Sequence, residues 1–139
     1  MVDYEEVWDG LLNLLKSDEE LASSIRDWLF GTPVRSPERF PHIHVQFEGG
    51  PIEPLTSGGK ARDTMRFFIV VVDRHVDEDA AERSVVRLAL RIRRVLESDR
   101  TLGGLVHDSR LTGKEMGVLR VRDYAVVGFR WTWEGYVVE

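Results

Sequence analysis

The sequence contains no cysteine and no apolar run long enough to cross a bilayer. The missing thiols exclude disulfides, thiolate zinc sites and cysteine nucleophiles, and they suit a reducing cytoplasm. The longest apolar run, Phe67 to Val72, has the length of a strand, whereas a membrane span needs about 20 apolar residues. The N-terminus is acidic and lacks the basic-then-apolar order of a signal peptide. We therefore expect neither a membrane protein nor a secreted disulfide scaffold.

Positive charge is also scarce, because 19 Lys and Arg residues face 24 Asp and Glu residues, for a net charge of −5. A protein whose main task is to grip nucleic acid usually carries a basic excess, so that class is disfavoured. The hydrophobic share of 42% is too high for a disordered chain. The length of 139 residues fits one core. We expect a single domain over residues 1–139.

The first 30 residues show helical spacing. Asp3 and Ser17 each stand three residues before a glutamate, the pattern of a capping box. The apolar residues that follow each box recur at spacings of three and four. The inner stripe of the second helix comprises Leu21, Ile25, Trp28 and Leu29. We therefore expect residues 1–30 to form a helical N-terminal part that ends at Gly31.

Two strands are predicted on either side of a long loop. Residues 42–48 alternate between apolar and polar side chains, as in a half-buried strand. Residues 49–63 contain two Gly-Gly pairs and two prolines, and we expect a long flexible loop without regular structure. Residues 64–73 are apolar on both faces, so both faces should be covered. Either the helices divide between the two faces, or another subunit supplies the second cover.

A long helix is predicted to follow, from Asp77 to about Ser98. Its acidic start complements the helix dipole, and its core stripe comprises Ala81, Val85, Leu88, Ile92 and Val95. A turn with Gly103 and Gly104 comes next.

The remaining chain is predicted to form strands. A weak strand is expected over residues 105–111, followed by a turn between Gly113 and Gly117. A strand over 118–122 comes next. The last strand is expected over 124–133, and Gly135 ends or bends it. The order of elements predicts an α+β fold. We expect a mixed or antiparallel sheet of four to five strands, with the N-terminal helices and one long helix packed on it.

Residues with reactive side chains do not form a complete constellation. His42 and His44 share a strand face and could supply two zinc ligands, but no spacing fixes a third among Glu48, His75 and His107. We favour a polar strand face exposed to solvent or to a partner. Nucleotide-binding, hydrolase and metalloprotease motifs are missing. The arginines of the long helix, Arg83, Arg87, Arg91 and Arg94, are read as a solvated face with partners one turn away. We expect no enzyme, no metal and no cofactor.

Four segments between residues 40 and 134 carry a family resemblance. They are FFIVVV at 67–72, the helix at 81–96, DRTLGGLV at 99–106 and YAVVGF at 124–129. In this order the chain resembles the tail-terminator, or tail-completion, proteins of long-tailed bacteriophages. The helix followed by D-x-T-L-G-G-L-V is the most telling stretch. The N-terminal helices match only in kind, and the Trp-rich last strand and the paired histidines depart from the family pattern.

The resemblance implies a structural virion protein without catalytic activity, made in the host cytoplasm. Such proteins form a ring of identical subunits, commonly six, at the head-proximal end of the tail. The ring stops polymerisation of the tube protein, faces the head connector or head-completion protein, and lets DNA pass through its lumen. An acidic chain suits such a lumen. A head-completion or neck protein of the same kind of virion, and a small ligand-binding α+β domain that uses His42 and His44, remain as alternatives.

The expected contacts with subunits or partners combine both lines of reasoning. In the family, extended loops and the sheet typically join subunits, which points to the loop and to the glycine turn. The strand at 64–73 is apolar on both faces, and the face that the core does not need is a further candidate for contact with a partner. The expected contact residues are Pro51, Ile52, Pro54, Leu55, Phe68, Val70, Val72, Gly103 and Gly104.

Overall fold

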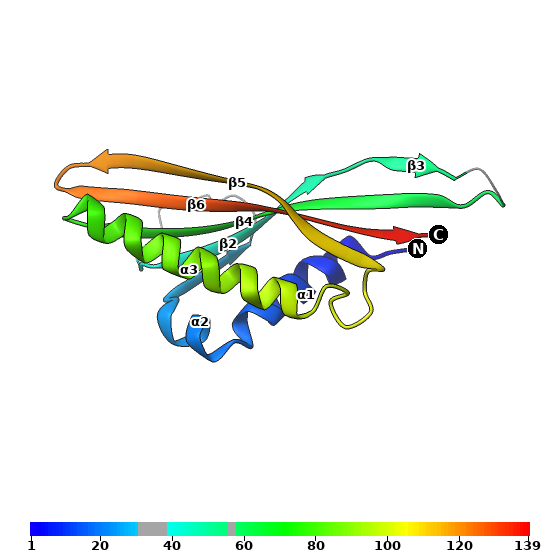
Figure 1. Cartoon of the computed structure of the whole chain (residues 1–139), viewed down its shortest axis with the longest axis horizontal. Helices are drawn as coiled ribbons and strands as arrows, with labels where there is room; N and C mark the ends of the chain where they lie inside the picture. Colours follow the sequence, from blue (N-terminus) through cyan, green and yellow to red (C-terminus); the bar gives the residue numbers. More distant parts are fainter. Residues whose placement is uncertain (31–38, 56–57) are drawn as a thin grey trace.

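A computed structural model describes residues 1–30, 39–55 and 58–139, and within them it contains three helices and a six-stranded mixed sheet (Figure 1). The helices are α1 (Tyr4–Lys16), α2 (Glu19–Ser24) and α3 (Glu78–Ser98). The strands are β1 (Asp27–Phe30), β2 (His42–Gly49), β3 (Ile52–Pro54), β4 (Ala61–His75), β5 (Asp108–Val121) and β6 (Tyr124–Val138). The strand order is β1-β2-β4-β6-β5, and β3 pairs with the start of β4. The predicted α+β class with a mixed sheet is confirmed, although two short strands raise the expected number.

The N-terminal part is less helical than its spacing predicts. Asp3 caps α1 as expected, since its carboxylate accepts the backbone N–H groups of Glu5 and Glu6. The cap of α2 is Asp18 instead of Ser17, and the helix ends at Ser24. Asp27–Phe30 forms β1, parallel to the start of β2, so the prediction of a helix over these residues is wrong. Strand pairing outweighs the weak propensity of a six-residue helix, and Gly31 lies outside the described residues.

The predicted long loop at 49–63 contains a short hairpin. Ile52–Pro54 pairs antiparallel with Ala61–Asp63, and β4 begins at Ala61 instead of near residue 64. The prediction of no regular structure is therefore wrong for these residues, while 56–57 lie outside the described part. Gly50 turns the chain with φ of 142°, and a side chain there would collide with the carbonyl of Thr64. Glycine is thus needed for the hairpin, which we call the β3–β4 arm.

The C-terminal strands form one long hairpin. The expected turn between Gly113 and Gly117 does not exist, because β5 runs unbroken through both glycines and only shifts register between Leu111 and Gly113. The chain reverses instead at Arg122 and Asp123, between the two strands. Likewise β5 begins at Asp108, so residues 105–107 are not a strand, and β6 continues past Gly135 to Val138. Long cross-strand pairing overrides the local turn signal of isolated glycines.

All three helices lie on one face of the sheet (Figure 1). The first helix packs on β2, and α3 packs on β4 and β6. The predicted core stripe of α3 is buried, with Ile92 fully inaccessible. Two tryptophans that line this core also donate hydrogen bonds: Trp8 Nε1 to the Val45 carbonyl at 2.8 Å and Trp131 Nε1 to the Ala89 carbonyl at 2.9 Å. Residues 64–73 were expected to be covered on both faces, either by helices on each side of the sheet or by another subunit. The described helices all lie on one side, so the first of these expectations is wrong for them.

Two further features frame the surface. The chain termini lie side by side, with the N-terminal amine 3.7 Å from a carboxylate oxygen of Glu139 (Figure 1). Within the described residues, no helix combines the length and the apolar character that a membrane span requires.

Candidate assembly surface

The sheet face turned away from the helices is only half covered, and we call it the open face. Register sets its rows, because His42 pairs with Val72, His44 with Val70 and Gln46 with Phe68. The open face comprises His42, His44 and Gln46 on β2, Phe68, Val70 and Val72 on β4, and Val126, Gly128, Arg130 and Thr132 on β6. Apart from His42, all of these residues keep part of their surface exposed. The three apolar residues predicted on β4 thus lie together at the centre of an incompletely buried face.

Arginine side chains stack on the ring of Phe68 in the open face and on two aromatic rings beside it. The Arg130 guanidinium lies 4.0 Å from the ring centre of Phe68 and forms an ion pair with Glu115 at 2.8 Å. Arg74 lies 4.7 Å from the ring centres of both Phe40 and Tyr124. Stacked guanidinium groups cover apolar surface while keeping their charge in water. The open face is therefore apolar beneath and cationic above, which suits a surface that meets a partner.

Of the two histidines of the open face, His42 is buried and His44 is only partly exposed. His42 is 4% exposed, its ring lies 5.9 Å from that of His44, and neither Nδ1 atom has a hydrogen-bond partner among the described residues. Burial lowers the pKa of His42 to about 4, with repulsion from His44 adding to the shift and the carboxylates of Asp27 and Asp73 opposing it. Burial also lowers the pKa of His44. Both rings are neutral at pH 7, and the expectation of an exposed polar face is wrong for His42.

The residues considered as further metal ligands do not join these histidines. His75 lies 3.7 Å from a carboxylate oxygen of Asp73, and His107 Nδ1 accepts the backbone N–H of Val138 near the C-terminus. No group of three histidine, aspartate or glutamate side chains able to hold a metal occurs within residues 1–30, 39–55 and 58–139.

A serine, a histidine and an aspartate also meet at the start of α3, but not as a catalytic triad. The Ser84 hydroxyl donates to the buried carboxylate of Asp73, and the His75 ring approaches the same carboxylate. A nucleophilic serine must instead give its proton to the imidazole. Here the hydroxyl is committed to the acid, so the cluster joins α3 to β4, and sequence patterns gave no sign of it.

The remaining predicted contact residues lie in two places beside the C-terminal end of β6. On the β3–β4 arm, Ile52 is 64% and Leu55 42% exposed, and Pro51 and Pro54 are exposed as well. Ala61, which pairs with Pro54 next to the tip of the arm, forms reciprocal backbone hydrogen bonds with Glu139, the residue after β6. The turn between α3 and β5 exposes Gly103 and Gly104, both at positive φ. The structure thus places arm and turn near one end of the molecule, and the open face between that end and the β5–β6 turn.

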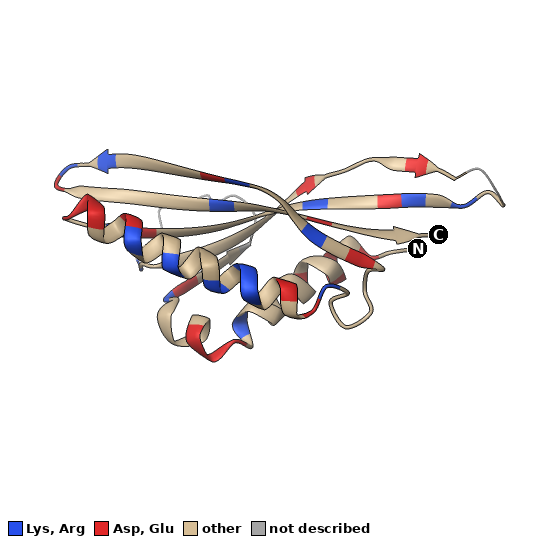
Figure 2. Ribbon diagram, in the orientation of Figure 1, with Lys and Arg blue, Asp and Glu red and all other residues tan. Residues whose placement is uncertain are grey.

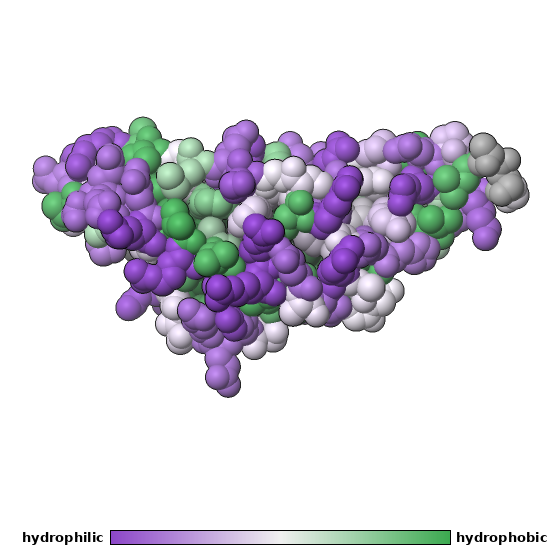
Figure 3. Space-filling view, in the orientation of Figure 1, coloured by the Kyte–Doolittle hydropathy of each residue, from purple (hydrophilic) through white to green (hydrophobic). Residues whose placement is uncertain are grey.

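Sequence reasoning missed a groove between α3 and β5. Val86, Leu90 and Met116 are each 48% exposed and line one part of it. Figure 3 shows apolar surface there, bordered by hydrophilic side chains. Towards the end of α3 the groove widens into a hollow of about 640 Å³, floored by Trp131 and Trp133. The signal was present in the sequence, because Val86 and Leu90 stand four residues apart and outside the core stripe.

Arginines edge this α3–β5 groove. Arg93, Arg100, Arg110 and Lys114 line the wide part together with Glu97, whereas in the narrow part Arg83 and Arg87 are balanced by Asp79 and Glu82. The predicted partners one turn away are confirmed for Arg83, which pairs with Asp79 at 2.8 Å. Arg91 differs, because it reaches across to α2 and binds Asp18 and Glu20. The hydrogen bond from Arg91 lowers the pKa of Asp18, so this pair joins α2 to α3.

Comparisons with known proteins add little to this geometry. No family model matches the chain, and no curated protein matches it either. Among solved structures, one similar chain comes from the "Virion of native gene transfer agent (GTA) particle", with 12% sequence identity, a TM-score of 0.41 and 94% of each chain covered. Similarity at that level assigns no function to this chain.

Proposed function

We propose that this chain is a structural virion protein, a phage tail terminator whose subunits form a ring on the head-proximal end of the tail tube. The ring ends tube polymerisation and presents a surface to the head connector or head-completion protein. The proposal combines the sequence resemblance over residues 40–134 with one observation: an extended sheet whose open face carries partly exposed Phe68, Val70 and Val72.

The open face supports assembly because its apolar residues gain from a cover that the described helices do not provide. Burying apolar surface contributes about 25 cal/mol per Å². Contiguous apolar surface rimmed by polar groups is typical of interaction sites. The stacked guanidinium groups of Arg74 and Arg130 can stay in place as a polar rim, or form ion pairs with a partner's carboxylates.

The β3–β4 arm supplies the second element of the proposal. Ile52 and Leu55 place apolar side chains on a projecting hairpin, where a neighbouring subunit or the tube end can bury them. The exposed turn at Gly103 and Gly104 lies near residues 137–139 and leaves room for the backbone of a partner to approach closely. Six subunits, as in the resembling family, would enclose a lumen through which DNA passes without sequence-specific contact, and the net charge of −5 disfavours adhesion.

The test is a tube-length assay. Purified protein is added to polymerising tail-tube subunits, and tube lengths are measured by electron microscopy. We expect shortened tubes with a ring at one end, and loss of that effect when Ile52 and Leu55 are both replaced by serine. A matched control replaces Val76 with serine, another exposed apolar residue that lies outside the open face, the arm and the α3–β5 groove.

Two results would contradict the proposal. Unchanged tube lengths, with the protein still monomeric beside assembled tails, exclude a terminator. Binding to assembled heads or connectors but not to tubes would instead identify a head-completion or neck protein.

A further inference from the structure

Charge is segregated between two parts of the fold. Residues 1–30 carry eight Asp and Glu against two Lys and Arg, a net charge of −6. Residues 83–122, which cover most of α3 and all of β5, carry ten Lys and Arg against four Asp and Glu, a net charge of +6. Figure 2 shows the basic residues of α3 along the helix after its acidic first turn. The modest overall charge therefore conceals two segments of opposite net charge, which one ion-paired arginine, Arg91, joins to each other.

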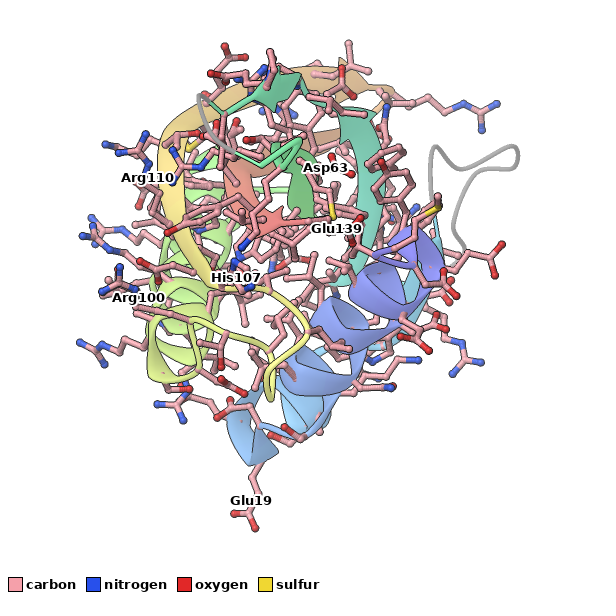
Figure 4. The ribbon with its side chains drawn as sticks, turned by 90° about the vertical axis from the view of Figure 1, so that its right-hand side faces the viewer. Glu19, Asp63, Arg100, His107, Arg110 and Glu139 are labelled. Atoms are coloured by element: carbon pink, nitrogen blue, oxygen red, sulfur yellow. The ribbon has the colours of Figure 1, made fainter. Side chains whose placement is uncertain are left out.

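The two charged parts lie towards opposite edges of the sheet. The strand order begins at β1 and β2, on which α1 packs, and ends at β5. In Figure 4, α1 lies on the right, whereas β5 and α3 lie on the left with Arg100 and Arg110 pointing outward. Glu19 of α2 points away from the body of the molecule in the same view. One copy thus presents acidic α1 on one side and the basic side of α3 and β5 on the other, while α2 lies at the bottom of the view and contacts α3 through Arg91.

The acidic surface is the outward side of α1 together with the start of α2. Its members Glu5, Glu6, Asp9, Glu19 and Glu20 are all exposed. Glu5, Glu6 and Asp9 lie away from the buried residues of α1, so the core does not occupy them, whereas Glu20 of α2 already pairs with Arg91 of α3 at 3.1 Å.

The basic surface is the α3–β5 groove. Its narrow part is apolar, with Val86, Leu90 and Met116 about half exposed, and its wide part is basic, with three arginines and Lys114 against Glu97. An apolar centre with a charged rim is the usual anatomy of a protein–protein interface. Beside it, β5 ends the strand order, so its outer edge has no partner strand among the described residues. Such an edge is normally covered or protected.

We infer that the α3–β5 groove of one copy receives the acidic side of α1 and α2 of a second copy. This inference rests on the proposed function, because it names the surfaces through which the ring closes. A two-fold contact through either surface alone would set like charges against each other, which disfavours a symmetric dimer. A head-to-tail contact sets opposite charges together, and its repetition forms a ring when the rotation closes.

Charge reversal on each side tests the inference. Arg87→Glu with Lys114→Glu reverses the groove, and Asp9→Lys with Glu19→Lys reverses the helices; all four side chains are exposed. Each double variant alone should associate at least tenfold more weakly than the wild type, measured by light scattering and by ring formation on tail tubes. Circular dichroism checks that both variants fold. Arg26→Glu with Arg39→Glu gives the control, an equal charge change at exposed positions away from the groove.

Mixing the two double variants is the decisive step. The acidified groove of one variant matches the basic helices of the other, and the unchanged surfaces also match. The mixture should therefore recover assembly with both variants in equal numbers, as should a chain that carries all four substitutions. Assembly of the mixture, when neither variant assembles alone, would show that the two surfaces contact each other, because a general effect of net charge would not restore assembly.

The possible failures are distinguishable. If the wild type assembles and the two double variants assemble equally well, the ring uses other surfaces; the inference fails and the proposed function stands. If the groove variant loses binding to duplex DNA while its assembly is unchanged, the groove is a nucleic-acid surface, which also overturns the inference. If the wild type assembles neither alone nor on tail tubes, the proposed function fails and the inference with it.

Discussion

The stability of the fold should fall on mild acidification because of His42. Its pKa is about 4 in the folded chain, against an ordinary value of 6.5, since the ring is buried. Between these two values the unfolded chain binds more protons than the folded one, so unfolding becomes easier as the pH falls. The contribution of His42 to the free energy of unfolding is complete above pH 6.5 and is lost as the pH falls towards 4.

The magnitude follows from the difference between the two pKa values. One pKa unit corresponds to about 1.4 kcal/mol. His42 alone should therefore lower the free energy of unfolding by about 2 kcal/mol between pH 7.5 and pH 5, and by about 3 kcal/mol at pH 4. His44 shifts in the same direction and adds to the slope. Asp18 contributes at lower pH, because its pKa is lowered from 3.8.

The assay is urea unfolding of the wild type and of His42→Leu at pH values from 4.5 to 7.5. Leucine keeps an apolar side chain beside Phe40 but carries no proton, so the variant should lose most of the slope that His42 causes. Gln46→Leu is the matched control, on the same strand and the same face, and should retain the slope. If His42→Leu and the wild type lose stability in parallel over this range, the account of a neutral buried histidine is wrong.

Three further predictions concern packing and exposure. Ile92→Ala should cost about 2–5 kcal/mol of unfolding free energy, whereas exposed Arg87→Ala should change it by less than about 0.5 kcal/mol, and denaturant titrations giving the reverse order would show that the faces of α3 are misassigned. Gly135→Ala should cost about 1–3 kcal/mol, because its methyl group would overlap the Trp133 ring, and an unchanged thermal midpoint would contradict that packing. The backbone amides of Ile52, Glu53 and Leu55 should exchange hydrogen more rapidly in the free subunit than in the ring; equal rates in both states would exclude the arm from the interface.

The sequence predicted what depends on local periodicity. The face of α3 that packs on the sheet, the cap at Asp3 and the alternation of residues 42–48 all follow from short-range spacing, and the structure confirms them. Pairing over long distances was harder to foresee. Asp27–Phe30 becomes a strand only because the start of β2 lies beside it.

The candidate site shows the same division. The surplus apolar face at Phe68, Val70 and Val72 was visible because both faces of one strand were apolar. The shielding of Phe68 by Arg130 was not, since it joins residues far apart in sequence on neighbouring strands. Gly113 and Gly117 led to the wrong prediction of a turn, because local glycine signals do not show that β6 is long enough to pair with the whole of β5.

The ladder between β4 and β6 has a mechanical consequence. Fourteen successive residue pairs join the two strands, from Arg62 with Val138 to His75 with Ala125. Tension applied along the strands loads these hydrogen bonds in shear, so many must yield together, whereas a force across the strands would break them one at a time. The arm and the β5–β6 turn lie at opposite ends of this ladder (Figure 1). A subunit held at those two ends would transmit a pulling force along its length while the β4–β6 ladder stays intact.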